Sequence, residues 1–72
     1  MAKVTGDKRL IFSKRLRSLR LTNHLTLTQL SQSLDIPCST LSCWERGTAF
    51  PRNPVEIDII AYFFGVKRDY LF

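Results

Sequence analysis

Helix start and stop signals recur so closely along this chain that none of its helices can be long. Pro37 forbids continuation of a preceding helix, and Asn53-Pro54 is typical of a helix start. Gly47 and Gly65 stand where glycine commonly ends a helix in a left-handed conformation. Between these points apolar residues recur at helical spacing, and no strand pattern competes with them. The sequence therefore predicts an all-α protein built from short amphipathic helices.

Four helices and a last turn are predicted from this pattern. They are expected at residues 8–21, 27–34, 38–46 and 54–64, followed by a turn at 68–72. Thr26 and Gln29 have the spacing of a capping box at the second helix. Asp35 suits the tight left-handed turn that follows this helix. The apolar residues at helical spacing should form the core, namely Phe12, Leu16, Leu19, Leu27, Leu30, Leu34, Leu41, Trp44, Ile57, Ile60, Ala61 and Phe64.

The length of 72 residues predicts one small domain. Residues 1–7 are polar and lack periodicity, so we expect a flexible basic N-terminal arm there and the folded domain at 8–72. A chain this short buries only about 60% of its unfolded surface, which leaves a thin stability margin. Such a domain has little room for a deep catalytic cleft.

The net charge of +5 directs attention to polyanions. Eleven Lys and Arg residues stand against six Asp and Glu, and the pI is about 9.8. Seven of the eleven basic residues fall within the first twenty positions, and Arg46 and Arg52 follow after a gap. This balance indicates nucleic acid first and an anionic membrane surface second. The sequence contains no run of 18 apolar residues, so we predict no transmembrane span.

The sequence contains no residue pattern that is typical of an enzyme active site. The chain has one histidine, no paired carboxylates in a plausible cleft and no glycine-rich phosphate loop. His24, Cys38 and Cys43 lack both a fourth metal ligand and the usual ligand spacing. We therefore expect no enzyme activity, no metal, no cofactor and no small-molecule substrate.

The cysteines and the N-terminus indicate a cytoplasmic protein. Cys38 and Cys43 lie five residues apart in one predicted helix, where they point to different sides and form a poor disulfide frame. Reduced thiols fit this spacing better. The first nine residues lack the apolar core of a secretion signal.

Several stretches in a fixed order carry a family resemblance that spans about residues 12 to 72. They are Arg15-Leu16-Arg17-Ser18-Leu19-Arg20, Leu25-Thr26, Ser39-Thr40-Leu41-Ser42, Trp44-Glu45-Arg46-Gly47, and Phe64-Gly65-Val66 with Asp69-Tyr70-Leu71. Together they resemble the Cro/C1-type (XRE) family of phage-repressor-like helix-turn-helix DNA-binding domains. The resemblance implies a lambda-repressor-like five-helix bundle and a cytoplasmic protein of bacterial or phage type. It also implies sequence-specific binding of double-stranded DNA by a small transcriptional regulator, a repressor.

The resemblance further implies roles for individual residues. The helix at about 38–46 would lie in the major groove, and the second helix would direct its N-terminus at a phosphate. The base-facing residues would be Cys38, Ser39, Thr40, Ser42 and Cys43. The phosphate-facing residues would be Thr26, Thr28, Arg46, Thr48 and Arg52. Arg20 and Glu45 would form a largely buried ion pair between the first and third helices.

Three positions depart from the family pattern. Leu27 stands where members usually place a phosphate-binding Gln, and Pro37 replaces the common capping Ser or Thr. Cys38 and Cys43 occupy base-reading positions, although cysteine cannot make bidentate contacts to a base. Affinity should then depend on phosphate contacts, and specificity on DNA shape, thymine methyl groups or dimer spacing. The alternative is a divergent helix-turn-helix domain that serves as a protein-interaction module with little or no DNA specificity.

The C-terminal part carries more apolar side chains than a core of this size needs. Ile59, Tyr62 and Phe63 lie outside the core stripe of their helix, and Tyr70 and Phe72 follow. An excess of exposed aromatic surface is typical of an interface. We therefore predict a weak homodimer through the C-terminal helices that is tightened on a two-half-site operator.

Overall fold

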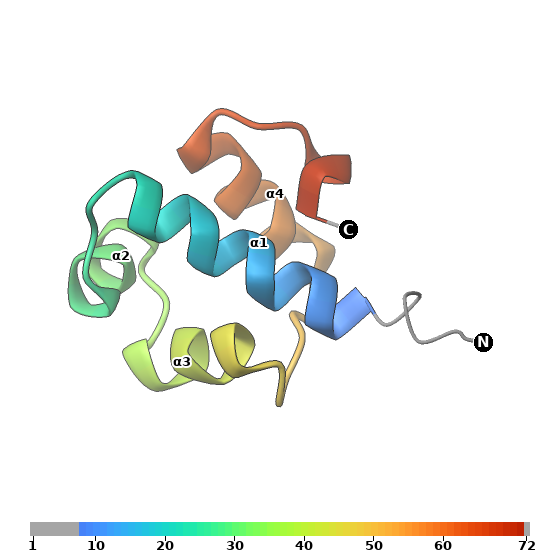
Figure 1. Cartoon of the computed structure of the whole chain (residues 1–72), viewed down its shortest axis with the longest axis horizontal. Helices are drawn as coiled ribbons and strands as arrows, with labels where there is room; N and C mark the ends of the chain where they lie inside the picture. The colour runs from blue at the N-terminus through green and yellow to red at the C-terminus, as the bar shows by residue number, and fades with distance from the viewer. Residues whose placement is uncertain (1–7, 72) are drawn as a thin grey trace.

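The protein is all-α in the computed structural model, which describes residues 8–71 (Figure 1). The helices are α1 (Lys8–Thr22), α2 (Leu27–Leu34), α3 (Cys38–Arg46) and α4 (Pro54–Phe64), followed by the 3₁₀ helix η2 (Arg68–Leu71). The arm predicted at residues 1–7 and residue Phe72 lie outside the described residues. The predicted helix bounds agree with the observed ones to within a residue.

The starts of α2 and α4 are fixed by the side chains that the sequence indicated. The Thr26 hydroxyl accepts a hydrogen bond from the Gln29 backbone N–H at 3.1 Å, and the Gln29 side chain accepts one from Thr26 N–H at 2.9 Å. This reciprocal pair is the predicted capping box. At α4, Asn53 accepts from the Val55 N–H at 3.0 Å and Pro54 is the first helical residue.

Left-handed residues end all four helices or follow them closely. The φ angles are 57° at His24 and Asp35, 78° at Gly47 and 69° at Gly65. Gly47 also lies close to α1, because a Cβ atom placed on it would come within 3.2 Å of the Leu10 side chain. Glycine at this position therefore meets both a backbone and a packing requirement.

The core lies where α1 packs against α3, with α2, α4 and η2 closing the remaining sides (Figure 1). Phe12 of α1 is fully buried and meets the rings of Trp44 and Phe50 edge-on, at centroid distances of 6.0 and 5.2 Å. Every apolar residue predicted for the core is either buried or packed against it. Ile36 and Leu71 are also buried, which the periodicity did not predict.

Where the family resemblance implied a fifth helix, the structure has the 3₁₀ helix η2. Gly65 adopts the left-handed conformation and ends α4, and η2 then spans only four residues. The turn is closed by an i→i+3 hydrogen bond, which the Tyr70 N–H donates to the Lys67 carbonyl at 2.9 Å, as in a 3₁₀ helix. Leu71 anchors this turn by burying its side chain completely. The part of the chain that the structure describes thus has four α-helices and one short 3₁₀ helix.

Candidate nucleic-acid interface

A rigid three-residue turn at 35–37 joins α2 to α3. Asp35 takes the left-handed conformation, and the buried Ile36 side chain anchors the turn to the core. The Ser31 hydroxyl donates a hydrogen bond of 2.6 Å to the Ile36 carbonyl, and Ile36 N–H donates to the Ser31 carbonyl at 3.2 Å. Pro37 provides no side-chain cap for α3. Packing and two hydrogen bonds therefore hold the two helices in a defined relation.

The outer face of α3 carries small side chains over residues 38–43, followed by the exposed Arg46 in its last turn. Leu41 and Trp44 are buried on its inner face, which leaves the opposite face open to solvent. Cys38 and Ser39 at its first turn are exposed. The other predicted base-facing residues keep partial exposure, namely Thr40, Ser42 and Cys43. Both cysteines are free thiols. The five predicted side chains thus lie on one helix, and all of them have access to solvent.

Exposed basic and hydroxyl groups lie at both ends of the α2–α3 unit. Thr26 and Thr28 are exposed at the start of α2, with the Thr26 hydroxyl already engaged as the helix cap. Arg46 is exposed at the end of α3, and its guanidinium lies 3.6 Å from the sulfur of Cys43. Two further exposed residues, Thr48 and Arg52, follow in the loop. All five predicted phosphate-facing residues are therefore accessible to a ligand.

An ion pair between Arg20 and Glu45 joins α1 to α3. Arg20 Nε lies 2.7 Å from one oxygen of the Glu45 carboxylate, and its Nη2 lies 3.0 Å from the other. The side chains are only 13% and 7% exposed. Arg20 also donates to the Leu25 carbonyl at 2.9 Å, which ties in the segment that precedes α2. The structure thus contains the pair that the sequence analysis expected, in the bidentate form.

Glu45 raises the pKa of the Arg20 guanidinium above its ordinary value. Its hydrogen bonds to the carboxylate favour the charged form most strongly, and the negative charge of Glu45 adds to this effect. Burial lowers the pKa of Arg20, but its effect is smaller than that of the hydrogen bonds to Glu45, so the net shift is upward. The Arg20 guanidinium therefore stays positively charged at every pH at which the domain would be studied.

One long-range contact had no signal in the sequence. Arg15 of α1 donates a hydrogen bond of 2.8 Å to the Tyr70 carbonyl, and its guanidinium carbon lies 4.7 Å from the centre of the Tyr70 ring. A cation over an aromatic face is an attractive arrangement. The contact joins residues 55 positions apart, so no local pattern could have predicted it. It fastens η2 to α1 and engages one aromatic residue that the sequence analysis assigned to a dimer surface.

The formal charges divide unequally along the fold. Residues 8–53, which form α1, α2, α3 and the following loop, contain eight Lys and Arg but only two Asp and Glu. One of those two acids is Glu45, which is committed to Arg20. Residues 54–71, which form α4 and η2, contain two basic and three acidic residues. Six of those eight basic residues lie in α1, whereas α2 has none and α3 has only Arg46, so most of the positive charge belongs to α1.

Residues 8–71 contain no group of three His, Cys, Asp or Glu side chains that could hold a metal ion. Within the same residues, every helix is too short or too polar to cross a membrane. The chain matches no protein-family model, no curated protein and no solved structure in comparisons with each.

Proposed function

We propose that this protein binds double-stranded DNA sequence-specifically as a small transcriptional regulator, with α3 in the major groove. We propose that α2, the turn and α3 act as a helix-turn-helix, as the resemblance to the Cro/C1-type family implies. Repression is the simplest mode, because occupying a promoter needs no surface beyond the one that binds DNA. The observation that carries the proposal is the outward face of α3, which is accessible, carries small side chains over residues 38–43 and ends at the exposed Arg46, with the exposed Arg52 in the loop beyond.

The size of the α3 side chains favours close approach to base edges. A major groove about 12 Å wide admits an α-helix. Cys38 and Ser39 are short and exposed at the first turn of α3, so the helix backbone could lie deep in the groove. Ser39 could share a hydrogen bond with a base, and the cysteines could contact thymine methyl groups. These contacts distinguish one base from another only weakly. Much of the specificity would then come from DNA shape and from the spacing of two half-sites.

The rigidity of the α2–α3 unit favours a role in recognition. The Arg20–Glu45 pair fixes α3 against α1, and the capping box fixes the start of α2. The N-terminus of α2 then offers its positive dipole end and the exposed Thr28 to a phosphate. Arg46 and Arg52 would meet phosphates on the other side of α3. Such backbone contacts set the register of a recognition helix on DNA.

Binding to duplex DNA over a salt series tests the proposal. Anisotropy of a labelled random duplex should show log K falling linearly with log salt, with a slope of about −0.9 per phosphate neutralised. Arg52→Ala should weaken binding to every sequence about equally and flatten the slope by about one.

Lys67→Ala is the matched control, since it removes the same charge from an exposed residue between α4 and η2. It should leave the slope close to that of the wild type. An equal loss from both variants would mean that Arg52 acts only through the net charge, and absence of binding at low salt would exclude the proposed function.

A protein-interaction module is the second candidate function. Its supporting observation is the pair of cysteines at positions where a base-reading helix needs strong hydrogen-bonding groups. In that case the exposed face of α3 would bind a protein, and Arg46 and Arg52 would have no phosphates to neutralise. Weak, salt-insensitive association with DNA would favour this candidate over the first.

A further inference from the structure

Two basic residues of α1 are available to a ligand. The helix contains no acidic residue that could pair with them. Arg15 and Arg20 are already engaged, the first with η2 and the second with α3. Lys14 and Arg17, in contrast, are exposed and have no hydrogen-bond or ionic partner among residues 8–71. Their charges are therefore not neutralised within the described part of the chain.

Lys14 and Arg17 belong to a longer stripe that also contains two exposed leucines. Leu10 is 44% exposed and Leu21 is 52% exposed. The steps along Leu10, Lys14, Arg17 and Leu21 are four, three and four residues, which is the alternation of the a and d positions in a helix that packs lengthwise against another helix. At 1.5 Å per residue, these four residues span about 17 Å. We call them the α1 stripe, which has cations in the middle and an apolar side chain at each end.

The fold leaves the α1 stripe uncovered. The buried residues Phe12 and Leu16 lie on the opposite side of the helix. Arg20 reaches α3 and Arg15 reaches η2, so these two elements lie along the flanks of α1. In Figure 1, α1 crosses the front of the molecule, and none of the described helices lies over the side turned to the viewer. The stripe is therefore accessible to a partner.

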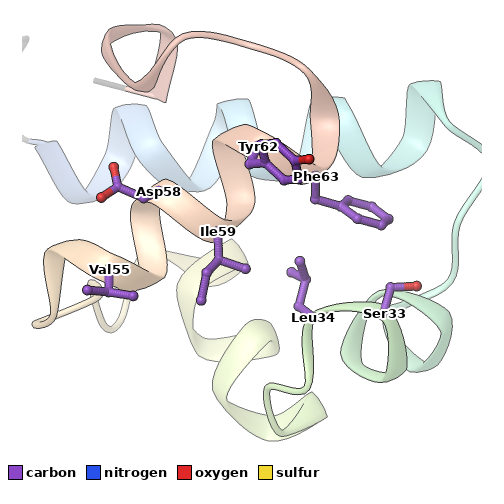
Figure 2. Close-up of a pocket in the computed structure, with 7 residues that line it drawn as sticks. All are labelled: Ser33, Leu34, Val55, Asp58, Ile59, Tyr62 and Phe63. Atoms are coloured by element: carbon purple, nitrogen blue, oxygen red, sulfur yellow. The ribbon is translucent and has the colours of Figure 1, made fainter.

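The α1 stripe is distinct from an apolar groove elsewhere on the surface. This groove, of about 440 Å³, lies between the end of α2 and the outer face of α4, and no residue of α1 or α3 lines it. Figure 2 shows Leu34 rising from α2 toward Ile59 across the groove, with α1 behind α4. Its one carboxylate, Asp58, is paired at 3.4 Å with Arg68. The groove thus has no free charge that would select a partner, whereas the α1 stripe has two.

The charge and spacing of the α1 stripe select an acidic helix as its partner. Two copies of the stripe would repel each other, because parallel pairing places Lys14 against Lys14 and antiparallel pairing places it against Arg17. A phosphate backbone would neutralise both cations but would leave both leucines unburied. A helix that presents carboxylates to the cations and apolar side chains to the leucines matches all four residues at once.

We propose that the α1 stripe binds an acidic amphipathic helix of a partner protein. The partner places two carboxylates against Lys14 and Arg17 and an apolar side chain against each of Leu10 and Leu21. The exposed Ser18 beside the stripe is small and lets the partner helix approach. The stripe covers only about three helical turns, so the interface is small and the complex is transient. None of the predicted DNA-facing residues lies in α1, so this interaction does not require DNA binding.

Anisotropy of a labelled synthetic helical peptide tests this binding. The peptide carries leucine, glutamate, glutamate and leucine at the spacing of the α1 stripe, and a second peptide has glutamine in place of both glutamates. The wild type should bind the glutamate peptide with an affinity that falls as salt rises, because salt screens opposite charges. It should bind the glutamine peptide ~10-fold more weakly, because two ion pairs are lost.

Substitutions in the stripe separate its charge from its apolar ends. Arg17→Glu should weaken binding of the glutamate peptide by at least ~10-fold, because repulsion replaces attraction. Lys67→Glu is the matched control, since it makes the same charge change at an exposed residue outside α1, and it should bind like the wild type. Leu21→Ser should also weaken binding, which a purely ionic contact would not predict. The replaced side chains are exposed, and far-ultraviolet circular dichroism verifies that the variants fold.

Reversing both charges provides a rescue. The variant with Lys14→Glu and Arg17→Glu together should prefer a peptide with lysine in place of both glutamates. Amide chemical shifts of the wild type should change along residues 10–21 and not along 38–43 when the glutamate peptide is added.

Several results would overturn the proposal. They are no binding of the glutamate peptide at low salt, equal binding of the glutamine peptide, and unchanged binding by Arg17→Glu or Leu21→Ser. Binding through Lys14 and Arg17 to duplex DNA, or to vesicles of phosphatidylserine and phosphatidylcholine, in place of the peptide would also overturn it. A peptide complex in a protein that binds no DNA would refute the proposed function and leave this interaction standing.

Discussion

Glu45→Ala should destabilise this domain more than any other single removal of a charged side chain. The substitution removes a carboxylate that accepts two hydrogen bonds from Arg20, at 2.7 and 3.0 Å, in a site where both side chains are nearly buried. Arg20 is then left with one partner, the Leu25 carbonyl. A guanidinium held away from water without its counter-charge is costly, because Arg20 cannot lose its proton to escape the penalty.

The magnitude follows from this geometry. Removing one partner of a buried ion pair costs about 3–5 kcal/mol. Arg20 keeps the Leu25 bond and 13% exposure, which places the loss near the lower end, at about 3 kcal/mol. Domains of this size rarely hold more than ~3–5 kcal/mol of stability. At 4–8 °C per kcal/mol, the melting temperature should fall by about 12–24 °C, and the variant keeps at most about 2 kcal/mol of stability.

Thermal and urea denaturation followed by circular dichroism measure this loss. Asp58→Ala is the control, since it breaks the Asp58–Arg68 pair, whose side chains are about half exposed, and should cost at most about 1 kcal/mol. Replacing both partners, with Arg20→Met and Glu45→Ala together, should recover part of the loss because no stranded charge remains. A Glu45→Ala variant that melts within a few degrees of the wild type would refute the reasoning.

Three smaller effects should also be measurable. Thr26→Ala removes the capping-box acceptor for α2 and should cost about 1 kcal/mol in urea denaturation. Gly47→Ala should cost more than Gly65→Ala, which should cost about 1–2 kcal/mol. Both glycines have positive φ, but only a Cβ at Gly47 would crowd Leu10, so equal losses would contradict the packing argument. Arg15→Ala should speed hydrogen exchange in η2 while leaving α3 unchanged, because it releases the contact between η2 and α1.

The helix bounds could be predicted because they depend on local chemistry. The Thr26 capping box, the Asn53 cap and the glycines at 47 and 65 act within a few residues of themselves, and their residue types are restricted by backbone geometry. The same holds for the buried face of each helix, which follows from the spacing of its apolar residues. The Arg20–Glu45 pairing came from the family resemblance, and no local pattern pairs those residues.

The remaining features depend on how distant segments pack. The groove needs Leu34 beside Ile59, and the fastening of η2 needs Arg15 over Tyr70. An exposed aromatic residue in the sequence indicates an interface but not its boundaries, so the predicted dimer surface included a residue that η2 uses to bind α1. The residue pattern predicted a last turn at 68–72, and the structure has the four-residue 3₁₀ helix Arg68–Leu71 there, where the family resemblance implied a fifth helix.

The most direct measurement of the proposed function is an amide chemical-shift map of the protein titrated with duplex DNA. Binding through α3 predicts that the largest changes fall at the start of α2, along residues 38–43 and in the loop at 46–52. Residues 57–64 of α4 should change little on a single half-site, because α4 contains none of the predicted DNA-facing residues. Changes concentrated on α4 or η2, or none at all with DNA at low salt, would contradict the assignment of α3 to the major groove.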